Sequence, residues 1–593
     1  MAAEPNNYWT PPPQPGKGGR CRPAEAPRCP AHDRRGCPVV PSPTFSRVPE
    51  ALTNPIINRG SAFSRADREK RGLVGRLPAG VLTLEQQAGR LWRQLCELPS
   101  DLARNLLLEQ MHNRNETLYY RVILDHLAEL VPVVYAPTVG DAIESYSDEY
   151  RGQRGAYLSI DHPDEIDATF DTFGLGPDDV DLIVCSDAEQ ILGIGDWGVN
   201  GIQIAVGKLA IYTAGAGIDP GRTLAVNLDV GTDNPDLLDD PFYLGNKHAR
   251  VRGERYDDFI RTYIETAHRR FPNAMLHFED FGLGNARRIL DTYAADYPVF
   301  NDDVQGTGAV VMAAVYSGLR ITGAAMRDQT MIVFGAGSAG VGIADNLRDA
   351  MIADGATREQ ACANIWLVDR PGLLFDDSDG LRDFQKPYLK SREQLGVAPG
   401  ATVDLLETIG LAAPTILLGT STVHGAFDEQ IVEKLCATTE RPMVFPISNP
   451  TSRIEGMPAD ILRWSQGRAL VAAGIPSDPL DYNGTTYHFG QANNFLVFPG
   501  LGLGVTLARA SRVTTAMLFA AGRAVAGHLD VDQPGAALLP DVTDIRAVSA
   551  AVAEAVYHAA HTDGVARATL DDPAGDIAKA MWQARYDQSD VGA

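Results

Sequence analysis

The chain of 593 residues carries a formal net charge of −24, with 45% hydrophobic and 22% charged residues. This length predicts two or more domains with a sizeable core, and the composition is ordinary for a globular protein. The negative charge argues against nucleic acid or an anionic membrane as the main partner. No apolar run reaches the roughly 18 residues of a membrane span. The N-terminus lacks the apolar core of a secretory signal, so we expect a cytoplasmic protein.

The first segment, residues 1–48, is rich in proline and arginine and predicts a disordered tail. An arginine-rich organelle transit peptide is the alternative, which Glu4 and Glu25 weaken. Cys29 and His32 have the spacing of half a zinc site, but no second half follows, so zinc is not favoured there. Seven cysteines in so long a chain do not indicate a disulfide framework.

Helices are predicted from Leu82 to His126, because apolar residues recur there at intervals of three and four. The apolar run at 131–140, closed by Pro137 and Gly140, predicts a strand and a turn. Further buried strands are expected at 182–187, 223–233 and 276–282, and a buried helix at 201–218.

From Gln329 onward, the residue pattern alternates between segments typical of strands and segments typical of helices. Apolar strands are expected at 330–337, 364–369, 415–421, 443–449 and 469–474, and a helix at 338–351. This alternation predicts a Rossmann-type, doubly wound, mostly parallel sheet. The Ala-rich segments 515–529 and 547–564 predict helices. The fold class is therefore α/β: a Rossmann-type domain and an α/β substrate domain, with helical N- and C-terminal sections.

Two acidic doublets stand in apolar surroundings: Glu279-Asp280 in HFEDFG and Asp302-Asp303 in FNDD. A buried carboxylate is costly unless a positive charge accompanies it. Four of them near an apolar wall indicate a divalent cation held by oxygen ligands.

Two G-x-G-x-x-G fingerprints compete, at 193–198 and at 335–340. The second follows a predicted strand and opens a helix, which is the dinucleotide-binding context. Its candidate cofactor residues are Gly335, Gly337, Ser338, Ala339 and Gly340. Asp369, at the next strand end, can bind the adenosine ribose, whereas Arg370 could bind a 2′-phosphate; NAD is favoured and NADP remains possible. The first fingerprint, with Trp197, is more typical of a turn beside a substrate site.

Several polar side chains lie in apolar segments. Lys208 would become a base near neutral pH if desolvation lowered its pKa, and the alternative is a lysine at a helix edge with its ammonium in water. Tyr135 is either a core tyrosine or a phenolic acid. Asn449, Asn493 and Asn494 either stabilise turns or bind ligand carboxylate and carboxamide groups.

Many of these segments occur in the order found in malic enzymes: YAPTVG, ILGIGDWG, LDVGTDN, FEDFG, FNDDVQGTGAV, FGAGSAG, SNPTS and GQANN. The chain resembles this family from about Asn54 to Ala566. The resemblance implies oxidation of L-malate with NAD(P) and decarboxylation to pyruvate, with Mn²⁺ or Mg²⁺. It also implies a substrate and metal domain at 49–304, an NAD-binding domain at 305–568, a helical tail at 569–593, and a homo-dimer or homo-tetramer.

By this resemblance, Glu279, Asp280 and Asp303 are expected to be the metal ligands, and Asp302 supports them and the base. Lys208 matches the lysine that takes the proton of the malate C2 hydroxyl.

The same resemblance matches Tyr135 to the tyrosine that protonates the enol carbon. Asn449 and Asn493 match asparagines near malate and nicotinamide. Gln385 matches a position that NAD-preferring members often fill with glutamine.

One position departs from the family pattern. Family members usually carry an arginine that binds the malate carboxylate in DGERILG, and this chain has Gln190 there, in DAEQILG. A neutral amide cannot make the bidentate, charge-assisted bond of arginine. Malolactic enzymes, which share the tryptophan of GIGDWG, also lack that arginine and make lactate with tightly held NAD. A malolactic enzyme is therefore the alternative, and a non-catalytic NAD sensor is a third hypothesis.

Overall fold

The computed structural model describes residues 48–150, 152 and 154–586. The described residues from Pro49 onward belong to one compact unit. The predicted tail and the pair Cys29 and His32 fall on residues before this range. Within the described part of the chain, no helix combines the length and the apolar character needed to cross a bilayer.

The N-terminal section is helical, which confirms the prediction for residues 82–126. Its helices are α1 (Arg65–Lys70), α2 (Leu84–Cys96), α3 (Asp101–His112), α4 (Glu116–Asp125), α5 (Leu127–Val134), α6 (Thr138–Glu144) and α7 (Tyr146–Glu149). The apolar spacing works as expected in α2, where Leu84, Ala88, Leu91 and Leu95 are buried on one face. Thr83 begins this helix with a capping box, as its side chain accepts from a backbone amide of the first turn.

The prediction of a strand and turn at 131–140 is wrong. The segment contains the end of α5 and the start of α6, and Tyr135 lies at the junction. Val131, Val133 and Val134 are all buried, and the sequence of this part of the helix is therefore a continuous apolar run. Periodicity alone cannot distinguish such a short run from a buried strand.

The first sheet has five parallel strands in the order β1-β3-β2-β4-β5. They are β1 (Ala156–Ser159), β2 (Leu182–Ser186), β3 (Thr223–Asp229), β4 (Met275–Phe278) and β5 (Val299–Asn301). One face packs on α9 (Ile202–Ala216), the predicted buried helix. The other face packs on α8 (Ile166–Asp171), α11 (Glu254–Arg270) and α12 (Leu283–Tyr293). Leu182 and Val184 face the first layer, and Ile183 and Cys185 face the second.

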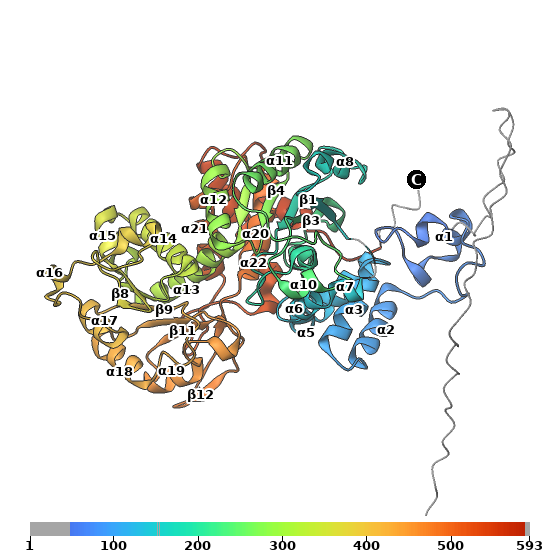
Figure 1. Ribbon diagram of the computed structural model, residues 1–593. Coiled ribbons are helices and arrows are strands. Elements are labelled where there is room, and N and C mark those ends of the chain that lie inside the picture. The colour runs from blue at the N-terminus through green and yellow to red at the C-terminus, as the bar shows by residue number, and fades with distance from the viewer. Residues whose placement is uncertain (1–47, 151, 153, 587–593) are drawn as a thin grey trace, which may run out of the picture. The chain divides into compact units, whose positions relative to one another are not determined.

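The second sheet has seven strands in the order β14-β11-β10-β9-β6-β7-β8, parallel except for β8. They are β6 (Met331–Phe334), β7 (Ile365–Asp369), β8 (Gly372–Leu373), β9 (Ile416–Gly419), β10 (Met443–Pro446), β11 (Leu470–Ala473) and β14 (Gly490–Gln491). Figure 1 shows α13 (Thr307–Thr322), α14 (Ser338–Ala353) and α15 (Arg358–Ala363) on one side of β9. On the other side lie α17 (Leu405–Ala412), α18 (Glu429–Thr438) and α19 (Pro458–Trp464). The molecule is thus an α/β protein with a doubly wound, Rossmann-type sheet.

The C-terminal section returns to the first sheet. Its helices are α20 (Phe498–Ala508), α21 (Thr515–Gly527), α22 (Ile545–Thr562) and α23 (Pro573–Ala580). Helices α20 and α22 pack on α9, where Gly215 leaves room for Pro499 and Ile545. A side chain at Gly215 would lie 2.9 Å from Ile545. Residues distant in sequence therefore enclose the inner face of the first sheet.

Candidate active site

The two acidic doublets meet because they follow neighbouring strands. β4 and β5 are parallel, and Phe278 pairs in register with Asn301, so both strands end at one edge. Asp302 and Asp303 open a single π-helical turn, Asp302–Gly306. The backbone N–H of Asp280 donates to Asp303 Oδ2 at 2.9 Å and joins the two loops.

Glu279, Asp280 and Asp303 form a group whose carboxylate oxygens lie within 4.8 Å of one another. Burial raises the pKa of both aspartates well above the usual value, and neighbouring carboxylates add to the rise. Oδ2 of Asp280 is buried and has no hydrogen-bond partner. An unpaired buried oxygen among three carboxylates fits a hard divalent cation such as Mn²⁺ or Mg²⁺.

Lys208 lies on α9 and is only 1% exposed, so the interpretation as a lysine with its ammonium in water is wrong. Its Nζ lies 2.7 Å from Asp302 Oδ2 and 2.6 Å from Glu279 Oε1. Burial lowers the pKa of Lys208, but these two carboxylates outweigh burial and hold the pKa well above the ordinary value. The hypothesis that desolvation lowers the pKa of Lys208 toward neutrality is therefore wrong.

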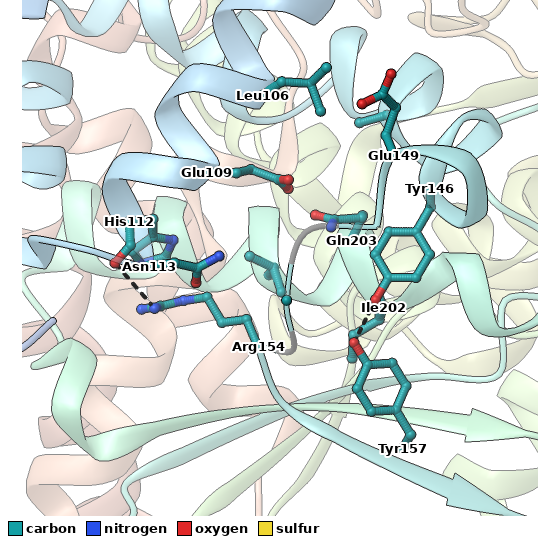
Figure 2. A pocket seen from close by; sticks show the side chains of 13 residues that line it. Leu106, Glu109, His112, Asn113, Tyr146, Glu149, Arg154, Tyr157, Ile202 and Gln203 are labelled. Atoms are coloured by element: carbon teal, nitrogen blue, oxygen red, sulfur yellow. Dashed lines mark hydrogen bonds between the residues drawn. The ribbon is translucent and has the colours of Figure 1, made fainter. Parts of the chain in front are cut away.

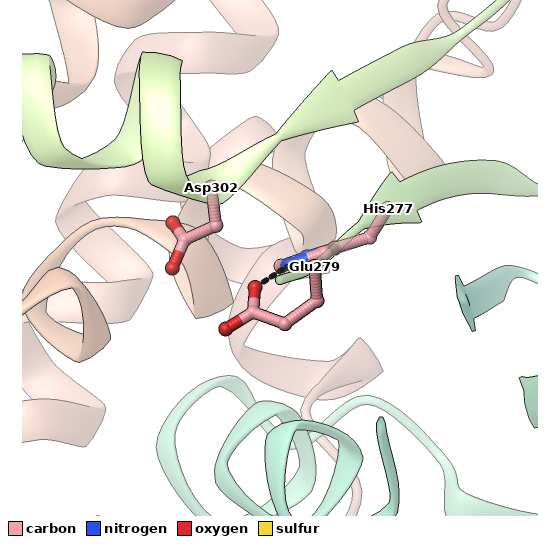
Figure 3. A group of neighbouring side chains, drawn as sticks. All are labelled: His277, Glu279 and Asp302. Atoms are coloured by element: carbon pink, nitrogen blue, oxygen red, sulfur yellow. Dashed lines mark hydrogen bonds and ion pairs between the residues drawn. The ribbon is translucent and has the colours of Figure 1, made fainter. Parts of the chain in front are cut away.

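A second group of possible ligands consists of His277, Glu279 and Asp302 (Figure 3). The ammonium of Lys208 already lies between two of its carboxylates. Lys208 and His277 together lower the pKa of Glu279 to about 2, although burial acts in the opposite direction. Because this group is compensated by lysine, a metal ion fits the group that contains Asp280 and Asp303 better.

Tyr135 faces the same cluster from the junction of α5 and α6. Its hydroxyl donates to Glu279 Oε1 at 3.2 Å, and its ring centroid lies 4.9 Å from Lys208 Nζ. Burial and the charge of Glu279 raise the pKa of Tyr135 well above its usual value, so the phenol keeps its proton. Base and acid candidates thus share one carboxylate oxygen.

Gly207 allows this close approach of α9 to Tyr135. A Cβ at residue 207 would lie 2.9 Å from the carbonyl oxygen of Val134 and 3.3 Å from the Tyr135 ring. We expect Gly207→Ala to destabilise the protein by about 1–3 kcal/mol through overpacking. Displacing Tyr135 should also lower turnover by roughly tenfold or more. Urea unfolding and steady-state kinetics would measure the two effects.

The matched control is Gly89→Ala on α2, where a Cβ meets no neighbouring atom within 4 Å. This variant should be more stable than the wild type by about 1 kcal/mol, because alanine favours a helix more than glycine does. Its turnover should be unchanged. Equal behaviour of the two variants would contradict the role given to Gly207.

The predicted substrate-binding residues are placed differently from one another. Asn494 Nδ2 donates to Asp302 Oδ2 at 3.0 Å, so this residue joins the carboxylate cluster. The neighbouring Asn493 caps a short 3-10 turn by accepting from the Phe495 amide. Gln190 donates its backbone N–H to the Asp280 carbonyl oxygen at 3.1 Å, and its side chain is exposed. Asn449 is exposed in the loop that follows β10 of the second sheet.

The second glycine fingerprint connects β6 to α14. Gly335 has a φ of +104°, and a Cβ there would lie 2.5 Å from the Ser421 amide nitrogen. A Cβ at residue 340 would likewise lie 2.4 Å from the Gly335 carbonyl oxygen. Ser338 and Ala339 form the first turn of α14, whose backbone N–H groups favour a phosphate. The first fingerprint, in contrast, forms a turn that begins beside Asp280.

Asp369 ends β7, the strand beside β6, so it lies at the same sheet edge as the glycine loop. Its carboxylate accepts from the Arg370 amide at 2.9 Å. Gln385 is buried, and its side-chain amide donates to the Ala336 carbonyl oxygen at 2.8 Å. In this structure Gln385 therefore braces the glycine loop.

Comparisons with known proteins agree with these features. The family model "Malic enzyme, N-terminal domain" matches residues 112–294, and "Malic enzyme, NAD binding domain" matches residues 304–561. A Mycobacterium tuberculosis protein named as a malate oxidoreductase (NAD) is 64% identical over 541 residues, 91% of this chain and 99% of that protein. The chain belongs to the malic enzyme family.

Other relatives in the family carry two different names. NAD-dependent malic enzyme 3 of Bacillus subtilis is 51% identical, over 92% of this chain and 97% of that protein. The malolactic enzyme of Lactococcus lactis is 44% identical, over 91% and 100%. The solved malic enzyme of Pyrococcus horikoshii shares the fold, with 21% identity, a TM-score of 0.52, and coverage of 77% of this chain and 89% of that one.

Gly337, the middle glycine of the fingerprint, differs from Gly335 and Gly340 in its surroundings. A Cβ there meets nothing within 4 Å, and its φ of −74° suits any residue. In dinucleotide-binding loops this position lets the backbone approach the pyrophosphate. We therefore expect Gly337→Ala to leave the melting temperature unchanged and to weaken NAD binding roughly tenfold or more. Calorimetric titration with NAD measures this, and unchanged affinity would contradict the assignment of the loop.

A pocket with a different lining lies between α3, α6, α7, β1 and α9 (Figure 2). Its walls include Glu109, His112, Arg154 and Gln203, and Tyr146 and Tyr157 join their hydroxyls at 2.6 Å. None of the predicted site residues lines it.

His277 and Tyr212, which extend the carboxylate cluster, were not predicted. His277 binds Glu279, and Tyr212 binds His277. A signal was present in the sequence, because His277 stands two residues before Glu279 and alternate residues of a strand share a face. Tyr212, four residues after Lys208, shares its helix face.

Proposed function

We propose that this protein is an NAD-dependent malic enzyme that converts L-malate to pyruvate and CO₂ with Mn²⁺ or Mg²⁺. The observation that carries the proposal is a buried cluster in which Glu279, a member of the proposed metal group, lies within hydrogen-bond reach of both Lys208 and Tyr135. A base, an acid and an oxygen-ligand site are the groups that oxidation followed by decarboxylation requires. The proposed domains are a substrate and metal domain at 49–304 and an NAD-binding domain at 305–568.

Glu279, Asp280 and Asp303 would hold the metal ion, which would supply Lewis acidity, and the loop at 335–340 would hold NAD, which would serve as the hydride acceptor. Lys208 takes the proton of the C2 hydroxyl, and Asp302 keeps its ammonium group directed into the cluster. After the C4 carboxylate leaves as CO₂, Tyr135 gives a proton to C3. The proton that Lys208 takes balances the one that Tyr135 gives. Glu279 Oε1 contacts both groups and holds them side by side.

Lys208 must lose a proton before it can act as a base. Its pKa is high because two carboxylates stabilise its ammonium form. Neutralising part of their negative charge with a bound cation reduces that stabilisation. The proposed mechanism therefore couples the basicity of Lys208 to occupancy of the metal site.

The favoured cofactor is NAD, because Asp369 lies at the edge where the adenosine ribose is expected. Arg370, which is exposed beside it, keeps NADP as the alternative. A cytoplasmic location and a homo-dimer or homo-tetramer remain predictions from the sequence.

Malolactic decarboxylation, which yields lactate with no net change of NAD, is the second candidate. The observation that favours it is Gln190, an exposed neutral side chain beside Asp280 where the family pattern has arginine. The Trp197 of GIGDWG is a further shared feature. A relative named malolactic enzyme, from Lactococcus lactis, is 44% identical to this chain.

One assay distinguishes these candidates. The protein is incubated with L-malate, NAD and Mn²⁺, and NADH absorbance, released CO₂ and lactate are measured together. Equimolar NADH and CO₂ without lactate is the expected result. Lactate without NADH would refute the proposal and support the malolactic reaction. Neither product would refute both and favour a non-catalytic NAD sensor.

A further inference from the structure

The carboxylate of Glu279 has a neighbour on each side. Oε1 contacts the Lys208 ammonium and accepts a hydrogen bond from the Tyr135 hydroxyl, whereas Oε2 lies 2.8 Å from His277 Nε2. Figure 3 shows the bond to His277 and the other oxygen directed away from the ring. The ring of His277 is held in turn at Nδ1, 2.7 Å from the Tyr212 hydroxyl.

All three side chains are buried from solvent, so no water competes for these bonds. Tyr212 and His277 are fully buried and Glu279 is 2% exposed. The rings of Phe300 and Phe498 pack edge-on against the His277 ring and restrict its rotation. A hydrogen bond in such surroundings fixes geometry more firmly than one at a surface.

The direction of the bonds follows from the groups. An ionised carboxylate can only accept, so the hydrogen between His277 and Glu279 is on Nε2. Burial raises the pKa of Tyr212 well above its usual value, so its hydroxyl has a hydrogen to donate to Nδ1. The two bonds therefore run in one direction, from Tyr212 through His277 to Glu279.

We propose that Tyr212 and His277 are positioning residues that fix the Glu279 carboxylate for metal binding. Glu279 could otherwise rotate about its terminal bond and turn either oxygen toward Lys208. With Oε2 held by His277, Oε1 stays in the cluster, and the carboxylate meets the cation already oriented. Both residues act through Glu279 and neither is placed on the substrate. This inference rests on the proposed metal site and adds the residues that orient it.

The experiment is calorimetric titration of the NAD-free protein with Mn²⁺, alongside thermal unfolding. His277→Leu keeps an apolar side chain but removes the donor, and it should weaken Mn²⁺ binding by about 10- to 100-fold. His277→Gln retains an N–H near the position of Nε2 and should recover most of the affinity. Tyr212→Phe removes one hydroxyl and should weaken binding roughly 2- to 10-fold. Unfolding temperatures separate these effects from loss of packing.

Tyr263→Phe is the matched control, because Tyr263 is fully buried on the opposite face of the same sheet. It should bind Mn²⁺ like the wild type. If the wild type binds no Mn²⁺, the proposed metal site fails. If the wild type binds and His277→Leu binds equally well, only the positioning role fails. Should His277→Leu not fold, unchanged affinity in Tyr212→Phe overturns the inference, and weakened affinity there supports it.

Discussion

Asp303→Ala is expected to abolish metal-dependent turnover while the protein remains folded. Asp303 is the least buried of the four carboxylates, and its Oδ2 accepts only from the Asp280 amide in this structure. Removing one of the three proposed anionic ligands leaves too few oxygens to replace the hydration of a divalent cation. Mutation of a residue that only hydrogen-bonds a metal ligand typically weakens metal affinity by about 10–100-fold. The loss of a ligand itself should therefore weaken Mn²⁺ binding by more than roughly 100-fold.

The direction of the stability change provides a second check. The pKa of Asp303 is raised by burial and by neighbouring carboxylates, so its charge is unfavourable in the metal-free protein near neutral pH. Metal-free Asp303→Ala should therefore unfold at the same temperature as the wild type, or higher. Calorimetric titration with Mn²⁺ and a thermal scan measure both properties. Asp296→Ala, at an exposed aspartate before the start of β5, is the control and should bind Mn²⁺ normally.

Retention of Mn²⁺ affinity in Asp303→Ala would contradict the ligand set. The second group, His277 with Glu279 and Asp302, would then be the site to test. That outcome would also require Lys208 to leave its present position, since its ammonium lies between Glu279 and Asp302.

The position of the acidic doublets could be predicted from the sequence for a simple reason. Parallel strands place their carboxyl ends at one edge, so acids that follow β4 and β5 must meet. The helix around Lys208 was also predictable, because an apolar character on all sides is typical of a buried helix. In both cases local pattern and tertiary position agree.

Other features required the tertiary structure. The segment 131–140 is buried on several sides, and this removed the periodicity that would have indicated α5 and α6. The pKa of Lys208 depends on Asp302, which is 94 residues away in the sequence. The apolar neighbours of Lys208 in the sequence therefore predicted a lowered pKa, whereas the structure raises it. The hairpin of β12 (Leu480–Tyr482) and β13 (Thr485–Tyr487) was missed, although its Asn483-Gly484 turn is a strong hairpin signal.

Lys208→Ala is expected to lower turnover by about 10²–10⁴-fold, the usual contribution of a general base. The same change leaves Glu279 and Asp302 buried without their counter-charge, which costs about 3–5 kcal/mol of stability when one partner of a buried pair is removed. Turnover must therefore be measured below the melting temperature of the variant, with saturating Mn²⁺ and malate. Lys386→Ala, at an exposed lysine, controls for the loss of a positive charge.

Lys208→Arg separates the two roles of this side chain. A guanidinium keeps the positive charge beside Asp302 but does not give up its proton at accessible pH. If Lys208 is the base, the arginine variant should recover much of the lost stability and none of the lost turnover. If turnover recovers together with stability, Lys208 acts only as a counter-ion that keeps the carboxylates in place. Because its Nζ contacts both Asp302 and Glu279, these roles cannot be told apart by the alanine variant alone.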